Sequence, residues 1–406
     1  MLSYESTPII IIQQLYYIEA KPILHRQVAS GKWIYGLIAR QFSSLQGYNI
    51  DMQILYMVTR EIEYPRNEVI LRALQRIGDV EVLGVSRRPI SLLANSLSIF
   101  LRAVPRLLFK KFDLVFVGFY GHLLMLPVGI LVNQPVLFDA FLSTYDTLSA
   151  DRENFPPRSI AGRLAFWLDR AACLLASQVL LDTSLHVEYF IKTLSLPVEK
   201  FNAVPVGCNE DHFFPRPRPL PGNETRVLYY STYMPLHGVE IVVQAAVSLR
   251  YEPIRFRLIG KGPTYQKVKH LADDLELENI EFVDVVPLQD LPGEITCADI
   301  CLGGHFGLSD KASRVIPGKI YQILAMAAPL IAADTPANQV LLQHKESAYL
   351  CPPGDPEALA LAISKLHGDR SLREHLARGG RQRYLEVCSE AIIRERLRSI
   401  IDELIG

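Results

Sequence analysis

The sequence predicts an α/β protein built from two doubly wound domains with a cleft between them. From Met52 onward, runs typical of buried strands alternate with helical patterns, and a stretch rich in proline and charge interrupts them at 215–226. A second alternating series follows that stretch. The chain has 406 residues, which is more than one ordinary core holds and fits two domains.

The first domain opens with a strand, a helix and a second strand. "QILYMV" (53–58) is typical of a buried strand, and "VEVLGV" (80–85) is predicted to be the next strand. Between them, "RNEVILRALQRI" (66–77) places apolar residues on one helical face. This order implies parallel strands with right-handed crossovers. Further strands at 113–118, 135–139, 177–182 and 200–207, with a helix at 161–176, extend the predicted domain over 52–206.

The first 51 residues lack this alternation. Two glutamines interrupt the apolar run near the start of the chain, and no basic segment precedes that run. The segment is therefore a poor match to a secretory signal peptide. We interpret 1–51 as an N-terminal extension that is either disordered or placed before the true start of the domain. An ordered element there is the less favoured alternative.

The second domain repeats the pattern after a linker at 207–226. Its predicted strands are 227–231, 254–260, 280–284, 299–303 and 329–333. The helix 355–368 is well formed, because Asp355 caps it, Pro356 fills its first turn and Gly368 stops it. We expect this domain to cover 227–386, and the last helix, 387–406, to pack back on the first domain.

Charge and cysteine content exclude several classes of protein. The chain carries 42 basic and 43 acidic residues, so we expect no nucleic-acid partner. Its six cysteines are scattered without zinc-site spacing, which favours buried thiols in a reducing cytoplasm. The longest unbroken apolar run, 123–132, has about half of the roughly 20 residues that a membrane span needs. We therefore expect a cytoplasmic protein without a membrane-spanning segment.

Three loops of the second domain follow strands and lead into helices, which places helix N-terminal amides at one sheet edge. They are "STYMPLHGVE" (231–240), "GKGPTY" (260–265) and the stretch 305–319. Amides together with lysine and arginine make a site for a diphosphate. The candidate residues are His237, Gly238, Gly260, Lys261, Gly262, Lys311, Arg314, Lys319 and Gln322. The alternatives are a tight turn at 260–262 and, at 305–319, a solvated basic loop beside a core helix.

The amino-acid sequence resembles glycosyltransferase family 4, the retaining glycosyl transferases group 1. That family has the GT-B fold of two Rossmann-like domains. The resemblance covers about 52–400 and is specific in the second half. It rests on "VPVGCNEDHFFP" (204–215), "HGVEIVVQAA" (237–246), 256–302, "PGKIYQILAMAAPLIAAD" (317–334) and "CPPGDPEALALAISKL" (351–366). It implies transfer of a sugar from a nucleotide-diphosphate sugar to a hydroxyl acceptor of a polysaccharide, glycolipid or glycan.

The sequence departs from the family pattern at the donor site. Two glutamates eight positions apart are usual there, and the matching positions hold Arg314 and Gln322. The basic pair of the first phosphate loop falls on Thr232 and His237. A glutamine both accepts and donates hydrogen bonds, so Gln322 still suits a ribose. Lys311, Arg314 and Lys319 then supply the charge that His237 supplies only partly at neutral pH.

The resemblance implies that catalytic groups come from loops of the first domain. His122 ends the loop 117–122, and Asp139 stands where the family often has a histidine. Asp139 is either a proton acceptor or a helix cap, and His122 either a catalytic or a surface residue. Asp146, Asp151 and Arg152 are expected to be loop and cap residues. No Asp-x-Asp pair occurs in the chain, so we expect no metal, and we expect no cofactor besides the donor substrate.

Other hypotheses remain open. A catalytically silent sugar-nucleotide binder fits Gln322 and His237, and a nucleotide-sugar epimerase shares the two-domain plan. A dehydrogenase is disfavoured because "GKGPTY" lacks the third glycine of the dinucleotide fingerprint. We expect a nucleotide sugar as one partner and a sugar or a lipid-linked acceptor as the other. The segment 97–113 mixes bulky apolar and basic residues, and it is either a membrane-facing surface on the inner leaflet or, as the favoured alternative, an ordinary sheet-covering helix.

Overall fold

The computed structural model describes residues 52–85, 91–151, 156, 158–219 and 222–406. The prediction for residues 1–51 therefore lies outside the described residues. The described part begins at Met52, where the sequence pattern begins, and 52–406 cluster as one unit.

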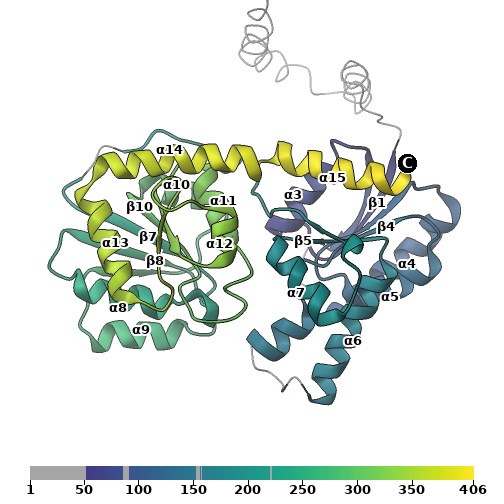
Figure 1. Cartoon of the computed structure of the whole chain (residues 1–406), viewed down its shortest axis with the longest axis horizontal. Coiled ribbons are helices and arrows are strands. Elements are labelled where there is room, and N and C mark those ends of the chain that lie inside the picture. The colour runs from purple at the N-terminus through teal and green to yellow at the C-terminus, as the bar shows by residue number, and fades with distance from the viewer. Residues whose placement is uncertain (1–51, 86–90, 152–155, 157, 220–221) are drawn as a thin grey trace, which may run out of the picture. The chain divides into compact units, whose positions relative to one another are not determined.

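The first half is a parallel sheet of six strands in the order β2-β1-β3-β4-β5-β6 (Figure 1). Its strands are β1 Gln53–Glu61, β2 Asp79–Val85, β3 Leu114–Val117, β4 Val136–Asp139, β5 Gln178–Leu181 and β6 Phe201–Ala203. The helices between them are α3 Pro65–Leu74, α4 Leu92–Phe109, α5 His122–Leu131, α6 Ile160–Leu175 and α7 Ser184–Leu194, with short turns η1 Asp146–Asp151 and η2 Val198–Lys200. The central strands β3 and β4 are buried at every position, which explains their runs of apolar residues.

The second half is a six-stranded parallel sheet in the order β12-β11-β10-β7-β8-β9. Its strands are β7 Thr225–Tyr230, β8 Ile254–Ile259, β9 Ile280–Val283, β10 Ile300–Gly304, β11 Leu330–Ala333 and β12 Tyr349–Cys351. Its helices are α8 Val239–Ser248, α9 Tyr265–Asp274, α10 Leu291–Cys297, α11 Gly318–Ala325, α12 Pro336–Leu341, α13 Pro356–Gly368 and α14 Arg370–Val387, and η3 Pro235–His237 precedes α8. The predicted α/β class with two doubly wound sheets is confirmed.

Each sheet has an apolar core on both of its faces. The last helix, α15 Glu390–Ile405, packs against α3 of the first half (Figure 1). Its residues Ile393, Leu397 and Ile401 are buried in the same apolar cluster as Ile54 and Val69. The chain therefore completes the core of its first half with its last helix, while α14 belongs to the second half through its contact with α11.

Several elements differ from their predicted bounds. The strand expected at 200–207 ends at Ala203, because the next two residues turn their carbonyl oxygens toward the guanidinium of Arg66. The apolar run 123–132 is helix α5, although it contains Pro127. The helix expected near 97–113 starts at Leu92 and continues through Pro105 to Phe109.

Helix α4 also changes the expectation about membranes. Among the residues that the structure describes, α4 is the one helix that could cross a bilayer, judged by its length and composition only. It holds Arg102 and Arg106 and contacts β1, β2 and α5, as an outer-layer helix of the sheet does. The prediction from unbroken apolar runs did not single it out, because polar residues from Asn95 to Arg106 interrupt its apolar sequence.

Candidate functional site

Ligands of open parallel sheets bind at the carboxyl ends of the strands, where the strand order reverses. In the second sheet the order reverses between β7 and β10, since β8 and β9 continue on one side and β11 and β12 on the other. The loops that follow these two strands are 231–238, which leads into α8, and 305–317, which leads into α11. This edge of the sheet is therefore the expected place for a ligand.

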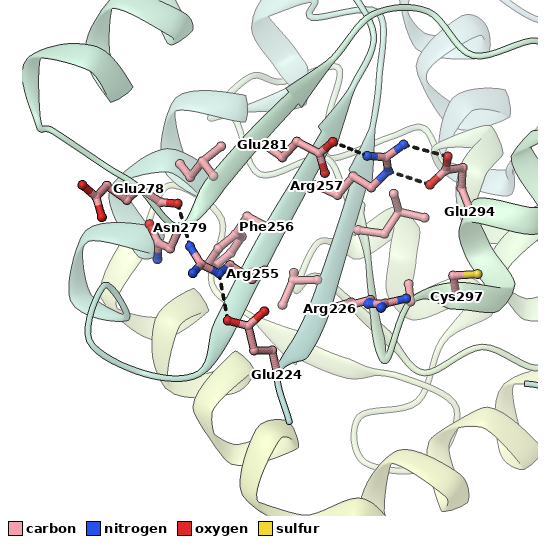
Figure 2. A pocket seen from close by; sticks show the side chains of 14 residues that line it. Glu224, Arg226, Arg255, Phe256, Arg257, Glu278, Asn279, Glu281, Glu294 and Cys297 are labelled. Atoms are coloured by element: carbon pink, nitrogen blue, oxygen red, sulfur yellow. Dashed lines mark hydrogen bonds and ion pairs between the residues drawn. The ribbon is translucent and has the colours of Figure 1, made fainter. Parts of the chain in front are cut away.

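A hollow at the other end of the same sheet is a poor candidate. It has a volume of about 540 Å³ and is lined by the amino-terminal halves of β7, β8 and β9 and by α10 (Figure 2). Arg257 donates to both Glu281 and Glu294, and Arg255 pairs with Glu224 (Figure 2). These arginine–carboxylate pairs satisfy one another, so the hollow offers little unbalanced charge to a ligand.

The two loops at the reversal point are bonded to each other. Phe306 N–H donates to His237 O at 3.3 Å, and Gly307 N–H donates to Leu236 O at 3.2 Å. Gly238, the N-cap of α8, has a φ of +63°, and a Cβ there would collide with Gly307 N. Only glycine fits this close approach, so Gly238 holds the two loops together.

Lys319 is the central cation of the site. It lies in the first turn of α11, its side chain is buried, and its Nζ has no hydrogen-bond partner. The Nζ lies 4.0 Å from the centroid of the Tyr229 ring and 5.7 Å from that of Tyr230. Burial lowers the pKa of Lys319 from 10.5 to about 7. An ammonium group held in this way lacks an anion, which a phosphate would supply.

Two histidines stand beside Lys319. The rings of His237 and His305 stack with centroids 5.3 Å apart. Burial, and next the charge of Lys319, lowers the pKa of His237 to about 3. Burial also holds the pKa of His305 well below its usual value, with smaller effects of His237, Lys319 and Lys311. We call His237, His305, Lys311 and Lys319 the basic cluster.

The histidines act as neutral donors in this arrangement. Met234 N–H donates to His237 Nδ1 at 3.3 Å, so the neutral ring carries its proton on Nε2. The expectation that His237 supplies part of a positive charge near pH 7 is therefore not supported. Lys319 supplies charge and the rings supply N–H groups, a combination that suits a diphosphate.

Gln322 lies one turn further along α11 and is buried. Its Oε1 accepts a hydrogen bond from the Tyr230 hydroxyl at 2.9 Å. No described residue accepts from its Nε2. The amide is thus held by one bond and keeps its donor for a ligand, which leaves the predicted ribose contact untested.

Lys311 and Arg314 contact the first half of the chain. Lys311 Nζ donates to Thr147 Oγ1 at 3.0 Å, and an Arg314 Nη donates to Asp146 Oδ1 at 2.9 Å. The Arg314 guanidinium also lies 4.1 Å from the centroid of the Tyr189 ring. Lys311 remains near enough to His305 to affect its pKa, whereas Arg314 is committed to Asp146. Asp146, expected to be a loop or cap residue, is a buried ion-pair partner.

The loop 260–262 has a different role from the predicted one. A Cβ at Gly260 or Gly262 would collide with the carbonyl oxygens of Ser231 and Thr232. These glycines therefore let the loop pack on the loop after β7, and the space beside them is filled by protein. Lys261 donates to Asp284 Oδ2 at 2.7 Å on the surface. The structure does not bring Lys261 into the basic cluster.

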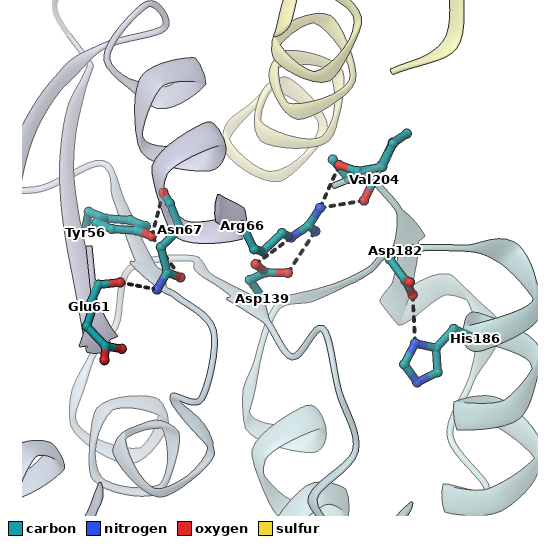
Figure 3. Close-up of polar contacts among 9 residues, drawn as sticks. Tyr56, Glu61, Arg66, Asn67, Asp139, Asp182, His186 and Val204 are labelled. Atoms are coloured by element: carbon teal, nitrogen blue, oxygen red, sulfur yellow. Dashed lines mark hydrogen bonds and ion pairs between the residues drawn. The ribbon is translucent and has the colours of Figure 1, made fainter. Parts of the chain in front are cut away.

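In the first half, Asp139 is part of a buried ion pair (Figure 3). Both of its oxygens accept from Arg66 at 2.9 Å, and Arg66 also donates to Val204 O and Pro205 O at 2.7 Å. Burial alone would lower the pKa of Arg66, but the Asp139 carboxylate outweighs it and raises that pKa. Arg66 thus joins the start of α3, the end of β4 and the segment after β6. This geometry argues against Asp139 as the proton acceptor.

His122 is better placed for chemistry. It is the first residue of α5, it is buried, and neither ring nitrogen has a hydrogen-bond partner. Its Nε2 lies 3.6 Å from Asp169 Oδ1, while Asp169 accepts from Ser143 Oγ and from the N–H groups of Thr144 and Tyr145. Burial lowers the pKa of His122, and Asp169 offsets part of that fall. The ring is therefore neutral near pH 7 and able to accept a proton.

A cavity of about 210 Å³ adjoins His122. Its other lining residues are mostly apolar and come from the loops after β3 and β4 and from three helices: Leu92, Phe119, Tyr120, Leu123, Leu142, Ser143, Thr144, Thr147, Leu148 and Leu168. Sequence reasoning missed this cavity, because its leucines are far apart in the chain.

Asp182 and His186 form a second pair that sequence reasoning missed (Figure 3). Asp182 Oδ1 lies 2.8 Å from His186 Nδ1, and the buried His186 Nε2 has no partner. The spacing of four residues at the start of α7 was the available signal. Thr183, between them, caps α7 and donates to Arg314 O at 2.7 Å.

Among the described residues, no group of three or more histidine, cysteine, aspartate or glutamate side chains is placed to hold a metal ion. The expectation of a reaction without metal or cofactor therefore stays a prediction.

Comparison with known proteins agrees with the fold. Residues 224–369 match the family described as glycosyl transferases group 1. The chain is 23% identical over 193 residues to the amylovoran biosynthesis glycosyltransferase AmsK of Erwinia amylovora, covering 47% of each chain. It is 22% identical over 280 residues to the alpha-D-kanosaminyltransferase of Streptomyces kanamyceticus, covering 64% of this chain and 67% of that protein. The chain spans about half the length of curated relatives such as AmsK.

Solved structures extend the likeness over both halves. Sucrose-phosphate synthase of Thermosynechococcus elongatus superposes with a TM-score of 0.70 at 16% identity, over 87% of this chain and 99% of that one. HepE of Anabaena in complex with UDP superposes with a TM-score of 0.64 at 16% identity, over 87% of this chain and 100% of that one. The fold is that of GT-B glycosyltransferases, as the sequence predicted.

Proposed function

We propose that this protein is a glycosyltransferase. It moves a sugar, with retention of configuration and without a metal ion, from a nucleotide-diphosphate sugar to a hydroxyl acceptor of a polysaccharide, glycolipid or glycan. The observation that carries the proposal is Lys319, a buried lysine without a partner, at the point where the strand order of the second sheet reverses. A buried cation without an anion is costly and belongs to a site that binds one.

The comparisons support the same activity. AmsK and the kanosaminyltransferase are named as glycosyl-group transferases, and the matched family covers the half that holds the basic cluster. Structures of HepE contain UDP and UDP-glucose, so a chain with this fold accommodates that class of donor.

The residues of the basic cluster act on the diphosphate. As the bond between the anomeric carbon and the phosphate oxygen breaks, the leaving diphosphate keeps the electron pair and gains charge. The Lys319 ammonium, and the N–H groups of His237 and His305, stabilise that charge in a site with little water. Gln322, oriented by Tyr230, donates its amide N–H to a ribose hydroxyl.

Because configuration is retained, the acceptor hydroxyl attacks the anomeric carbon from the face that the diphosphate leaves, and it must lose its proton. His122 is the first-half residue best suited to take it, because its neutral ring lines a cavity and has unpaired nitrogens. Asp169, which three donors hold in place, stabilises the imidazolium that forms.

Titration calorimetry with UDP and with uridine tests the donor site. We expect Lys319→Met to weaken UDP binding about 10- to 100-fold, because a charge-assisted bond is lost, and to leave uridine binding unchanged. Lys261→Met is the matched control, since Lys261 pairs with Asp284 outside the cluster. Equal losses for both ligands would show that Lys319 does not face the phosphates. GDP and ADP in the same titration identify the preferred base.

A catalytically silent sugar-nucleotide binder is the second candidate. It is favoured by Arg314, which is committed to Asp146, and by Asp139, which is committed to Arg66. Both positions then lack a carboxylate that faces substrate. Slow hydrolysis of bound UDP-glucose without acceptor supports the transferase, and tight binding without any turnover supports the silent binder.

A further inference from the structure

One turn of the first half holds Asp169 beside His122. The turn comprises residues 143–147, between β4 and α6. Asp169 accepts from Ser143 Oγ at 2.6 Å and from the N–H groups of the next two residues at 3.1 and 3.0 Å. Asp169 is fully buried, and its Oδ1 lies 3.6 Å from His122 Nε2. The position of this carboxylate is therefore set by the 143–147 turn as well as by α6.

Asp146, the next residue of the turn, belongs to the same network. Its N–H donates to Ser143 Oγ at 2.9 Å, so the Ser143 hydroxyl accepts from Asp146 and donates to Asp169. Thr147 N–H donates to Ser143 O at 3.0 Å and closes the turn. Hydrogen bonds thus connect Asp146 with the carboxylate that faces His122.

The second half of the chain contacts this turn at two points. Arg314 Nη2 donates to Asp146 Oδ1 at 2.9 Å, and Lys311 Nζ donates to Thr147 Oγ1 at 3.0 Å. Both cations lie on loop 305–317, which also contributes to the basic cluster. The loop that we assign to the leaving diphosphate therefore also holds the turn that positions the carboxylate of the first half.

The ion pair of Arg314 and Asp146 is buried but incompletely bonded. The Arg314 side chain is 17% exposed and that of Asp146 is 2% exposed. Within the described residues, Arg314 Nε and Asp146 Oδ2 are buried without a hydrogen-bond partner. Arg66 and Asp139, in contrast, share two hydrogen bonds that use both carboxylate oxygens (Figure 3). A buried pair that leaves polar atoms unsatisfied is costly for stability alone, which favours a role in function.

Asp169 acts on His122 in two ways. Its Oδ1 faces Nε2, which favours the neutral tautomer with the proton on Nε2 and leaves the lone pair of Nδ1 to take a proton. Burial lowers the pKa of His122, and the charges of Asp169 and then of Asp139 raise it. Of these two carboxylates, Asp139 at the end of β4 is paired with Arg66, which leaves Asp169 of α6 to respond to the turn.

We propose that Arg314 is a positioning residue for His122. Through Asp146 it fixes the 143–147 turn, and the turn fixes Asp169. Asp169 in turn orients the ring that takes the proton of the acceptor hydroxyl. A loop of the donor side thereby controls proton transfer on the acceptor side. The inference rests on the proposed function, in which His122 is the proton acceptor.

The pKa of His122 tests the proposal without an acceptor. It is measured by NMR on the full chain, with ¹³C and ¹⁵N in its ten histidines, and His122→Gln assigns the signal. Arg314→Met should lower this pKa and the share of rings protonated on Nε2, because Asp169 follows its three donors when the turn is released. Loss of a positive charge would by itself raise the pKa, so the sign separates positioning from a direct electrostatic effect.

Two further variants of arginine complete the set. Arg257→Met is the matched control, because Arg257 is paired with carboxylates at the opposite end of the second sheet, and it should leave His122 unchanged (Figure 2). Arg314→Lys keeps a charge and one donor, which is all that the observed pair uses, and should restore most of the unmodified pKa. Arg314→Gln replaces the methionine variant if that variant does not fold.

Hydrolysis of UDP-glucose, in which water stands in for the acceptor hydroxyl, gives a kinetic measurement. Arg314→Met should lower kcat about 10- to 100-fold, because proton acceptance becomes inefficient. It should change KM and the affinity for UDP less than about threefold, because Arg314 is paired with Asp146. The UDP affinity also shows that each variant remains folded.

Ser143→Ala tests the same path at another link. It removes the hydroxyl that joins Asp146 to Asp169, so it should lower the pKa of His122 as Arg314→Met does. The double variant should shift the pKa by less than the sum of the two single shifts, because both changes act through one path.

Three outcomes would overturn the inference: a raised or unchanged pKa of His122 in Arg314→Met, an equal shift in Arg257→Met, or additive shifts in the double variant. Failure of the proposed function is a separate result. It would appear as lost UDP binding in the unmodified protein or as full UDP-glucose hydrolysis by His122→Gln. The fall of the His122 pKa in Arg314→Met would in that case still establish the positioning.

Discussion

Replacement of Lys319 by methionine should stabilise the protein while it removes diphosphate binding. Lys319 is buried, its Nζ has no hydrogen-bond partner, and burial lowers its pKa from 10.5 to about 7. At about 1.4 kcal/mol for each pH unit, that fall costs the protonated folded state about 5 kcal/mol. The Tyr229 ring, 4.0 Å from Nζ, attracts the cation and offsets about 1–2 kcal/mol. Methionine fills similar space without charge, so we expect about 3 kcal/mol of added stability at pH 6.

The effect has a definite pH dependence. The folded pKa lies below the unfolded one, so between pH 7 and pH 10.5 the unfolded chain binds a proton that the folded chain does not. The free energy of unfolding of the unmodified protein therefore rises with pH through that window, and the cost of Lys319 is complete below pH 7. The advantage of Lys319→Met should shrink to about 1 kcal/mol or less at pH 10.

Urea unfolding at pH 6, 8 and 10, without nucleotide and then with UDP, measures both effects. UDP should stabilise the unmodified protein by about 2.7 kcal/mol at 100 times its dissociation constant. It should stabilise Lys319→Met far less at the same concentration. Lys261→Met is the control and should change neither quantity, since Lys261 is exposed and paired with Asp284. A variant less stable than the parent at every pH would refute the account of Lys319 as a buried, unpaired cation.

Three further predictions concern Asp139, Gln322 and the N-terminal segment. Asp139→Asn should lower the free energy of unfolding by about 3–5 kcal/mol, because it leaves Arg66 buried without its counter-charge; a stable but inactive variant would instead identify Asp139 as catalytic. Gln322→Ala should weaken UDP binding by about 1–3 kcal/mol. Gln322→Glu should raise the affinity for UDP only together with His237→Lys. Strict additivity of the two changes in a double-mutant cycle would show that the two positions are independent. Deletion of residues 1–50 should leave both the urea midpoint and UDP affinity unchanged, and loss of soluble protein would show that this segment is structural.

The sequence by itself determined the architecture. Continuous apolar runs of strand length, separated by helical patterns, are found wherever parallel strands are buried on both faces. The interruption at 215–226 separates the two series, and the start at Met52 matches the first described strand. The expected place of the proposed donor site, at the strand ends, also came from the sequence, because the carboxyl ends of parallel strands meet at one edge.

Only the tertiary structure decided which candidate side chains meet. Lys261, Arg314 and Lys319 are equally basic in the sequence, yet Lys261 pairs with Asp284, Arg314 with Asp146, and Lys319 with no described residue. Asp139 is held by Arg66, which lies 73 positions earlier. Periodicity reports which face of an element is buried, but it carries no information on partners that are distant in the chain. The charge that remains unpaired, and hence free to bind a ligand, is settled by packing between elements.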